Sequence, residues 1–498
     1  MKTAKRFISI LLAIVIAAGL LLPAFAVEKK NTGIPVINVD GIATRTLYLN
    51  PNTPEEQQVF YPTSDTLTNA IKSLALPAAK LAVDKNWNAF GDKLIPLAKT
   101  ILDPISCNPD GTVKYNVAIK DEWSIPAGYN FDTTLSFSYD WRLDPMDNSK
   151  RLNDYIKFVK QETGCEKVDL IPNSMGGTIV MAYLEQFGTD DVNAIVMRSS
   201  AFQGVSLVGE LFNKQLQINK RSVLGYVKGF LKADKQSEEM NLLISALDTF
   251  GVVDMILPVA DNLIYNLKDR IYNEVLIETF GYLPGIWSLV PDKYYESAKA
   301  IMLDPVKNAE LIRKIDIYHY DVQNKVKDLL QDAINKGVKV AVISNYNLYG
   351  CPITENPDAQ TDFLIDTVYS SGGATCAPLG STLGSGYIQA VNCGHNHISP
   401  DNIIDASTCM FPEYTWFVKG MRHTNFNDDY NALVNWILNY NGQPTVFDNA
   451  SYPQFLQLNK ADNTLSPVVT PMASILSNLQ IIFKILQNIK LLQALPAK

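Results

Sequence analysis

The stretch VDLIPNSMGGTIVMAYLEQFG, residues 168–188, predicts a β-strand that turns sharply into a helix at Ser174. The apolar run stops at Pro172-Asn173, and apolar residues at helical spacing begin again after Met175. A serine on such a turn is held in a strained conformation that exposes its hydroxyl, with the helix N-terminus directed at it. Gly176-Gly177 supply the small residues that let the helix and the strand approach closely. We therefore predict a nucleophile elbow at Ser174.

A second interpretation of Ser174 starts from its neighbours. The usual pattern is G-x-S-x-G, and Pro172 occupies the position of its first glycine. Proline cannot adopt a positive φ and has no N–H, so this turn departs from the pattern. Serine is also a favoured helix N-cap, and Ser174 could simply cap the helix 176–187. The motif alone does not decide between nucleophile and cap, but the rest of the chain favours the nucleophile.

The first 26 residues have the pattern of a secretory signal peptide. A basic start, MKTAKR (1–6), precedes an apolar run at 8–22 and the small-x-small sequence AFA at 24–26. The apolar run is short for a membrane span, and the residue directly after the expected cleavage site is Val27 rather than a cysteine that could carry a lipid anchor. We therefore expect a secreted protein, cleaved after Ala26.

The acidic composition of the chain argues against nucleic acid as a partner. The formal net charge of the whole chain is −8. Removal of the signal peptide takes away three positive charges and no acidic residue, so the mature chain has a net charge of −8 − 3 = −11. An acidic protein with dispersed charge is a poor candidate for binding nucleic acid. The mature chain, about 470 residues, can form one large α/β domain with an insertion, or two domains.

Strand and helix patterns alternate along the chain. Strands are predicted at 34–39, 134–141, 168–171, 193–199, 338–344 and 415–421, and helices at 148–163, 176–187, 322–336 and 426–440. This alternation predicts a mainly parallel sheet flanked by helices on both faces. Functional loops of such a sheet meet at the C-terminal ends of its strands.

The domain organisation follows from the interruptions of this pattern. We expect residues 27–204 and 331–450 to form the sheet domain and the helical stretch 205–330 to form a cap or lid inserted into it. Lids exclude water and present apolar surface to a substrate. An independent helical domain is the alternative, but the chain returns to the sheet after it.

Residues 451–498 are predicted to be a linker followed by a C-terminal amphipathic helix. The linker is SPVVTP (466–471), and the helix has an apolar stripe at Ile475, Leu479, Ile482, Leu486 and Ile489. Such a stripe usually packs on its own protein. Contact with a membrane surface or a partner is the alternative, although the polar face has few lysines.

Six cysteines follow the signal peptide: Cys107, Cys165, Cys351, Cys376, Cys393 and Cys409. An even number in an exported protein permits disulfides. Four of them lie in the glycine-rich stretch 351–409, where we expect at least one disulfide. Cys165, just before a strand, also suits a free buried thiol.

A serine nucleophile needs a histidine base, and the chain has four histidines. His319 lies within the helical insertion, whereas His395 and His397 lie in the cysteine-rich loop. His423 directly follows the strand 415–421 and precedes the last sheet-domain helix, where this architecture would present a base. We therefore choose His423.

The acid that orients the base should lie between the elbow and His423, after the strand 338–344. The segment TDFLIDTVYSSGGAT offers Asp362 and Asp366, and each could also be an ordinary turn residue. We prefer Asp362 and keep Asp366 as the alternative. Asp401 and Asp405 are weaker candidates.

Two N–H groups should bind the developing oxyanion. One donor is expected from Met175, the residue after the nucleophile. The other is expected from Ile42, because Gly41 permits a tight turn after the strand 34–39.

Five segments, in the right order, resemble motifs of the lecithin:cholesterol acyltransferase and lysosomal phospholipase family and of bacterial lipases. IPVINVDGIATRTL resembles the family's PVI-V-P-G-x-x-x-x-L opening, FSYDWRLDP its YDWR segment, NSMGG its HSMG or HSLG elbow, DFLIDTVYSS the D-G-x-V-x-x-S-S acid loop, and GMRHTNFNDDYNALVNWIL the histidine followed by the last helix. Together they span about residues 34 to 440.

The resemblance implies an α/β-hydrolase fold that acts on carboxylic esters without a cofactor. It implies Ser174, Asp362 and His423 as the catalytic triad and Ile42 and Met175 as the oxyanion donors. The sequence departs from the family where Pro172 and Asn173 replace Gly-His, Asp40 replaces the proline before Gly41, and Phe363 replaces the glycine after the acid. The last departure keeps Asp366 open.

Two other functions remain as alternatives. His395 and His397, with Asp401 or Asp405, have a spacing that metal ligands use, although GHNHISPD is predicted to be a loop. A non-catalytic binding protein on a hydrolase scaffold would also explain the altered elbow. The expected partner is an ester or lipid substrate, with lipid-surface contact through the cap or the C-terminal helix.

Overall fold

The computed structural model describes residues 33–60, 64–120, 123–217, 262, 265–424, 426–459 and 461–470. The predicted signal peptide and the predicted C-terminal amphipathic helix lie outside the described residues. Among the residues described, no helix is long and apolar enough to cross a membrane.

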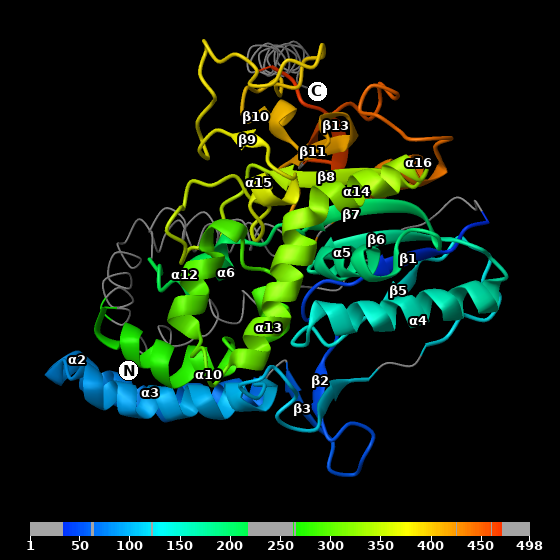
Figure 1. The fold of residues 1–498 in the computed structure, drawn as a ribbon. Helices are drawn as coiled ribbons and strands as arrows, with labels where there is room; N and C mark the ends of the chain where they lie inside the picture. Colours follow the sequence, from blue (N-terminus) through cyan, green and yellow to red (C-terminus); the bar gives the residue numbers. More distant parts are fainter. Residues whose placement is uncertain are drawn as a thin grey trace, which may run out of the picture.

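An eight-stranded sheet forms the centre of the molecule (Figure 1). Its strands lie in the order β13-β12-β11-β8-β7-β6-β1-β5. Their bounds are β1 Val36–Val39, β5 Leu135–Phe137, β6 Val168–Ser174, β7 Val192–Ser200, β8 Lys339–Tyr346, β11 Thr415–Lys419, β12 Phe455–Asn459 and β13 Thr464–Pro467. Every neighbouring pair is parallel except β12 and β13. The predicted mainly parallel sheet is therefore confirmed.

Helices cover both faces of the sheet, and the strands alternate accordingly. In β7, Ile195 and Met197 belong to the larger core cluster, which includes residues of α4 (Pro145–Thr163), α5 (Gly176–Phe187) and α14 (Val326–Asn335). Ala194 and Val196 point the other way, into a cluster with α16 (Asp428–Asn439). This period of two is the ordinary consequence of a strand buried on both faces.

The order of the strands creates a switch point between β1 and β6. From β1 the chain passes to β5 at the sheet edge, whereas from β6 it proceeds through β7 and β8 in the opposite direction. Crevices that bind ligands form at such points, outside the C-terminal ends of the strands. Ser174 is the last residue of β6 and therefore lies at this switch point.

The described part of the insertion is helical. Its elements are α6 Ser206–Phe212, η2 Tyr272–Leu276, α10 Ile277–Thr279, α11 Pro284–Trp287, α12 Asp292–Met302, α13 Ala309–Ile317, η3 Tyr318–Val322 and η4 Gln323–Lys325. Leu283, Ile286, Trp287 and Leu289 join the main core cluster, so this part packs onto the sheet domain.

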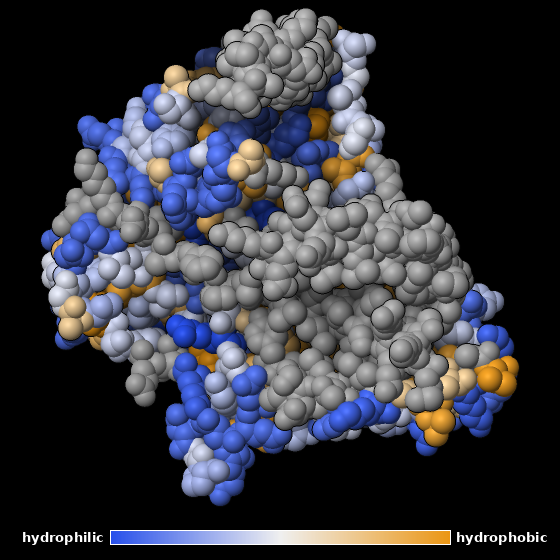
Figure 2. All heavy atoms as spheres, turned by 180° about the vertical axis from the view of Figure 1, so that it is seen from behind, coloured by the Kyte–Doolittle hydropathy of each residue, from blue (hydrophilic) through white to orange (hydrophobic). Residues whose placement is uncertain are grey.

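A helical hairpin and a small sheet complete the fold. The hairpin consists of α2 (Ser64–Asp84) and α3 (Trp87–Leu102), and α3 contacts the insertion through ion pairs such as Arg270–Asp92 at 3.0 Å. Strands β3 Gln57–Phe60, β2 Leu47–Leu49 and β4 Val117–Ile119 form a separate antiparallel sheet, and β9 Thr375–Cys376 pairs with β10 Ile404–Asp405. Two large apolar side chains of α2, Leu76 and Val83, are exposed. The view in Figure 2 shows apolar surface at this end of the molecule.

Two expectations about the chain are wrong. The stretch 466–471 does not begin as a linker, because β13 pairs with β12 and extends the sheet beyond residue 450. A strand at a sheet edge tolerates Pro467, whose missing N–H is not needed on the outer side. Second, all six cysteines are free thiols, so the structure contains no disulfide in 351–409. Cys165 is free as expected, but it is only partly buried.

Candidate active site

The turn at Ser174 is as sharp as the elbow prediction requires. Ser174 ends β6 with φ +51°, in the left-handed region that L-residues rarely adopt, and α5 begins at Gly176. Its carbonyl accepts a hydrogen bond from Ala201 N at 2.8 Å, which fixes the turn against β7. Pro172 lies two residues earlier in the strand, opposite Val39 of β1. The turn therefore forms without a positive φ at Pro172.

Three glycines make room for this turn. A Cβ at Gly176 would lie 2.3 Å from Val39 O, and a Cβ at Gly177 would lie 1.9 Å from Ser200 Oγ. A Cβ at Gly41 would lie 2.9 Å from the Cβ of Ser174. Side chains at these positions would clash, so the loop after β1, the elbow and the end of β7 require glycine for their close approach.

The structure brings His423 and Asp362 together. His423 Nδ1 lies 2.8 Å from Asp362 Oδ2, and His423 N donates to Asp362 O at 2.9 Å. Asp362 follows β8 and His423 follows β11, and these neighbouring strands end at the same edge as β6. Both side chains are buried. Within the described structure His423 Nε2 has no hydrogen-bond partner, so it is free to bond to a hydroxyl.

The carboxylate of Asp362 is held by its own loop. Its Oδ1 accepts hydrogen bonds from Ile365 N at 2.8 Å and Leu364 N at 3.1 Å, which leaves Oδ2 for the imidazole. Phe363 adopts φ +88°, a conformation that favours glycine. Phe363 therefore holds the backbone of this loop in a glycine-like conformation, and the loop presents Asp362 to His423.

Asp366, the alternative acid, faces another part of the molecule. Its Oδ2 accepts a hydrogen bond from Ser206 N at 2.8 Å, at the start of α6. Burial raises the pKa of Asp366, and the bond to Ser206 opposes that rise. Asp366 thus connects the acid loop to the insertion, whereas Asp362 contacts the histidine.

The predicted oxyanion donors flank the serine. Met175 follows Ser174 and is fully buried at the start of α5. Ile42 follows Gly41, where an added Cβ would lie 2.9 Å from the Cβ of Ser174. The assignment of their N–H groups to an oxyanion remains a prediction.

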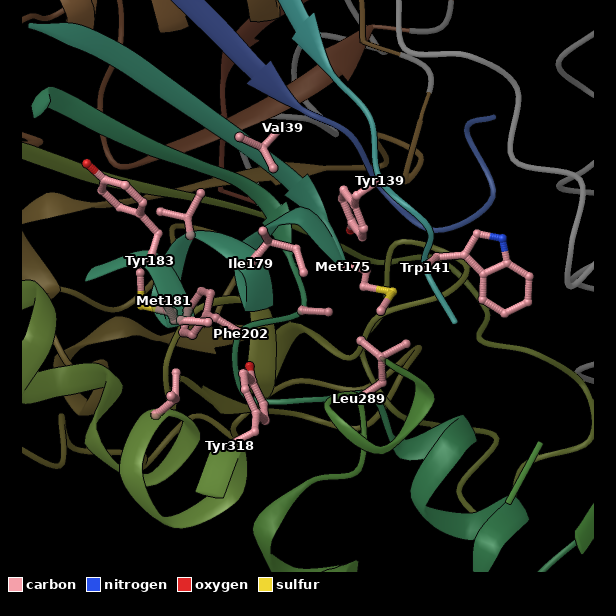
Figure 3. Packing of buried hydrophobic residues seen from close by; sticks show 14 of the residues in the cluster. Val39, Tyr139, Trp141, Met175, Ile179, Met181, Tyr183, Phe202, Leu289 and Tyr318 are labelled. Atoms are coloured by element: carbon pink, nitrogen blue, oxygen red, sulfur yellow. The ribbon is translucent and has the colours of Figure 1, made fainter. Parts of the chain in front are cut away.

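The insertion contacts the core beside the elbow. Gly285 N donates to Arg142 O at 3.0 Å, and a Cβ at Gly285 would lie 3.0 Å from Met175 Cε. Figure 3 shows Met175, Trp141 and Leu289 gathered in this region. The neighbourhood of the elbow on this side is therefore apolar.

The other three histidines have structural partners. His319 stacks on Tyr295 with ring centroids 3.6 Å apart and bonds to Gln323 and Asp292. The ring of His397 bonds to Gln454, and that of His395 to Glu413.

The metal-site alternative gains no support from this arrangement. Asp401 pairs with Lys419, and Asp405 accepts bonds from Ser407 N and Ala390 N. In the described ranges no group of three or more His, Cys, Asp or Glu side chains could hold a metal ion.

Sequence reasoning missed a buried polar group on the opposite face of the sheet. Arg198 of β7 is fully buried and bonds to Asn173 and Asn38. The signal that could have revealed it is an arginine within the otherwise apolar run NAIVMRSS.

One of three comparisons with known proteins, the match to a family model, supports the fold. Residues 126–247 match the family model described as the alpha/beta hydrolase fold. No curated protein matches the sequence. One solved structure, described as the crystal structure of the Tle4-Tli4 complex, is similar at 13% identity over 82% of this chain and 97% of that chain, with a TM-score of 0.30. So low a score carries no argument.

The family match and the central sheet together show an α/β-hydrolase fold, as predicted. This fold suggests hydrolase activity. The finer resemblance to the lecithin:cholesterol acyltransferase and lysosomal phospholipase family is not confirmed by these comparisons.

Proposed function

We propose that the protein is a serine hydrolase that cleaves or transfers the acyl group of carboxylic esters, with Ser174, His423 and Asp362 as its triad. One observation carries the proposal. The strained Ser174 ends β6 at the strand edge where His423 is bonded to Asp362 and keeps Nε2 unengaged. A helix cap needs neither a positive φ nor a histidine–aspartate pair at the same edge.

Each residue has a role in the proposed reaction. His423 Nε2 takes the proton of the Ser174 hydroxyl while its oxygen attacks the ester carbonyl carbon. Asp362 holds the Nδ1–H tautomer and stabilises the imidazolium that forms. The N–H groups of Met175 and Ile42 bind the oxyanion, and loss of one such donor costs about 10²- to 10³-fold in rate.

The second half of the reaction reverses the proton path. His423 protonates the leaving alcohol as the carbon–oxygen bond breaks, which leaves the acyl group on Ser174. Water then attacks the acyl-enzyme with His423 as base, and acid and enzyme are released. Another alcohol in place of water would give acyl transfer.

The proposed substrate is an ester with a long or bulky acyl group. The apolar side chains beside the elbow, including Trp141, Met175 and Leu289, support this choice because such groups bind in water-excluding apolar surroundings. We also propose export from the sequence of residues 1–26, and lipid-surface contact through the insertion or the C-terminal helix.

Labelling with a serine-directed fluorophosphonate tests the proposal. We expect labelling of the wild type at Ser174, none in Ser174→Ala, and a rate lower by at least about 10³-fold in His423→Ala. His395→Ala is the matched histidine control and should label like the wild type, with or without a chelator. Folded wild type that does not label would contradict the proposal and favour a binding protein on a hydrolase scaffold. Labelling that survives Ser174→Ala would place the nucleophile elsewhere.

A further inference from the structure

The buried arginine of β7 lies behind the elbow. Arg198 has no exposed surface and points to the face of the sheet that α16 covers, like Val196 two residues earlier. Its guanidinium stacks on the ring of Phe426 at 4.3 Å. Burial lowers the pKa of Arg198 to about 10, so the group stays charged at neutral pH. A buried charge is costly unless its hydrogen bonds are made.

The hydrogen bonds of Arg198 go to two asparagines rather than to a carboxylate. Its Nε donates to Asn173 Oδ1 and its Nη2 donates to Asn38 Oδ1 at 3.0 Å. Asn173 Nδ2 also donates to Asn38 Oδ1, which closes a triangle of side chains from β1, β6 and β7. These three strands meet at the switch point of the sheet.

Each asparagine leads directly to a segment that the proposed reaction uses. Asn173 precedes Ser174 in the chain. Asn38 Nδ2 donates to Asp40 Oδ1 at 2.7 Å, and Asp40 precedes Gly41, which packs against Ser174. The guanidinium is therefore connected, through one amide on each side, to the elbow and to the loop that holds Ile42.

The carboxylate of Asp40 completes this network. It accepts further hydrogen bonds from the hydroxyls of Ser136 and Ser138 on and beside β5. Burial raises the pKa of Asp40, and the bonds from Ser138, Ser136 and Asn38 oppose the rise. The hydrogen bonds to Asp40 thus fix the loop after β1 next to Ser174.

We propose that Arg198 is a positioning residue for acyl transfer, which fixes the elbow through Asn173 and the oxyanion loop through Asn38 and Asp40. This inference rests on the proposed function. The planar guanidinium can bond to two oxygens at once in a fixed geometry, which an ammonium group cannot reproduce. A shift of about 1 Å at a catalytic group can cost about 100-fold in rate, so loss of this fork affects the chemical step.

The test uses the full chain and p-nitrophenyl butyrate as the ester. In Arg198→Met, kcat should fall about 10- to 100-fold while KM changes less than about threefold, because the substrate does not touch Arg198. Arg198→Lys keeps the positive charge but not the planar pair of donors, so its kcat should lie between those of the wild type and Arg198→Met. Val196→Ala, on the same face of the same strand, creates a cavity without touching the network and should keep its kcat.

A double variant separates positioning from general destabilisation. If Arg198 acts through Asn173, Arg198→Met combined with Asn173→Ala should have a kcat no lower than the worse single variant. The inference would be overturned if the kcat losses of the two single variants multiply in the double variant. A folded Arg198→Met with kcat within threefold of the wild type would also overturn it. Should Arg198→Met not fold, a wild-type kcat in Arg198→Lys would overturn it equally. A wild type that neither hydrolyses the ester nor labels with fluorophosphonate would refute the proposed function, and this inference with it.

Discussion

At the scale of single residues, two positions of the proposed active site hold a strained backbone. Ser174, the proposed nucleophile, and Phe363, beside the proposed acid, both adopt positive φ. Such conformations cost about 1 to 3 kcal/mol each and persist only where the surroundings enforce them. Here Ala201 N and the close approach of Gly41 enforce the conformation of Ser174. This strained conformation holds the sharp turn from β6 into α5 at Ser174.

The strain at Ser174 can be measured with two inactive variants. Ser174→Ala and Ser174→Gly both lack the hydroxyl, but only alanine keeps the Cβ that disfavours φ +51°. We expect the glycine variant to be more stable than the alanine variant by about 1 kcal/mol, because glycine adopts this φ without steric cost. Urea unfolding of both variants measures the difference. An alanine variant that is equally stable or more stable would show that the elbow is not strained.

The residues of the candidate site differ in how far the sequence reveals them. The sequence contains only four histidines and one serine in an elbow pattern, so elimination pointed to His423 and Ser174. Asp362 was preferred, but Asp366 stayed open as the alternative, because both lie in one turn and only the folded loop directs Asp362 to the histidine and Asp366 to Ser206. Arg198 was missed because its partners come from two other strands, and a local pattern does not show which polar residues meet across a sheet.

At the scale of elements, helix α4 is capped at its N-terminus by a buried carboxyl group, that of Asp144. Asp144 caps the helix by accepting a hydrogen bond from Met146 N at 2.9 Å, and Pro145 follows it. N-caps of this kind satisfy an otherwise free backbone donor. Burial nevertheless raises the pKa of Asp144 to about 6, because the carboxylate is removed from water. The helix start is therefore sensitive to pH.

Replacement of Asp144 by asparagine should remove this sensitivity. Because the pKa of Asp144 is higher in the folded protein than in the unfolded chain, its contribution to stability is present below about pH 4 and is lost as the pH rises through 6. Asparagine caps helices equally well and does not titrate. We expect Asp144→Asn to gain stability relative to the wild type between pH 4 and 7, by about 2 to 3 kcal/mol.

Urea unfolding of both proteins across this pH range measures the gain. Asp147→Asn, an exposed position in the same helix turn, is the control. Its free energy of unfolding relative to the wild type should change by no more than about 1 kcal/mol between pH 4 and 7. If Asp144→Asn gains no stability relative to the wild type between pH 4 and 7, the raised pKa of Asp144 is contradicted.

The elements themselves were largely predictable, and the exceptions have physical causes. The strands and helices of the central sheet follow the alternating pattern, because strands buried on both faces are continuously apolar. The edge strand β13 was taken for a linker since its TLSP sequence is short and ends in proline, and only pairing with β12 makes it a strand. The helix predicted at 322–336 is broken, because η3 and η4 precede α14.

At the scale of the whole molecule, the insertion is fastened to the sheet domain next to the proposed nucleophile. Helix α11 meets the segment after β5 through Gly285, whose N–H bonds to Arg142 O. Val205 N bonds to Leu289 O at 2.8 Å, so the start of the insertion is tied to the same region. The insertion thus has a fixed contact at Met175, and its geometry bears on the proposed oxyanion site.

Gly285→Ala tests this contact. A Cβ there would lie 2.0 Å from Trp141 O and 2.9 Å from Leu143 O, and backbone atoms cannot move aside as a flexible side chain can. Helix α11 must therefore shift, with a stability loss of about 1 to 3 kcal/mol, and the shift reaches Met175, whose methyl lies 3.0 Å from the same point. We expect a lower Tm together with a lower kcat for p-nitrophenyl butyrate.

Gly386→Ala is the matched control, because a Cβ at Gly386 would have no atom within 4 Å. It should leave both Tm and kcat unchanged. A loss of Tm in Gly285→Ala without a loss of kcat would mean that α11 supports the fold but not the site. Wild-type values of both would mean that the insertion is not fastened at Gly285, and the contact with Met175 would then not be part of the active geometry.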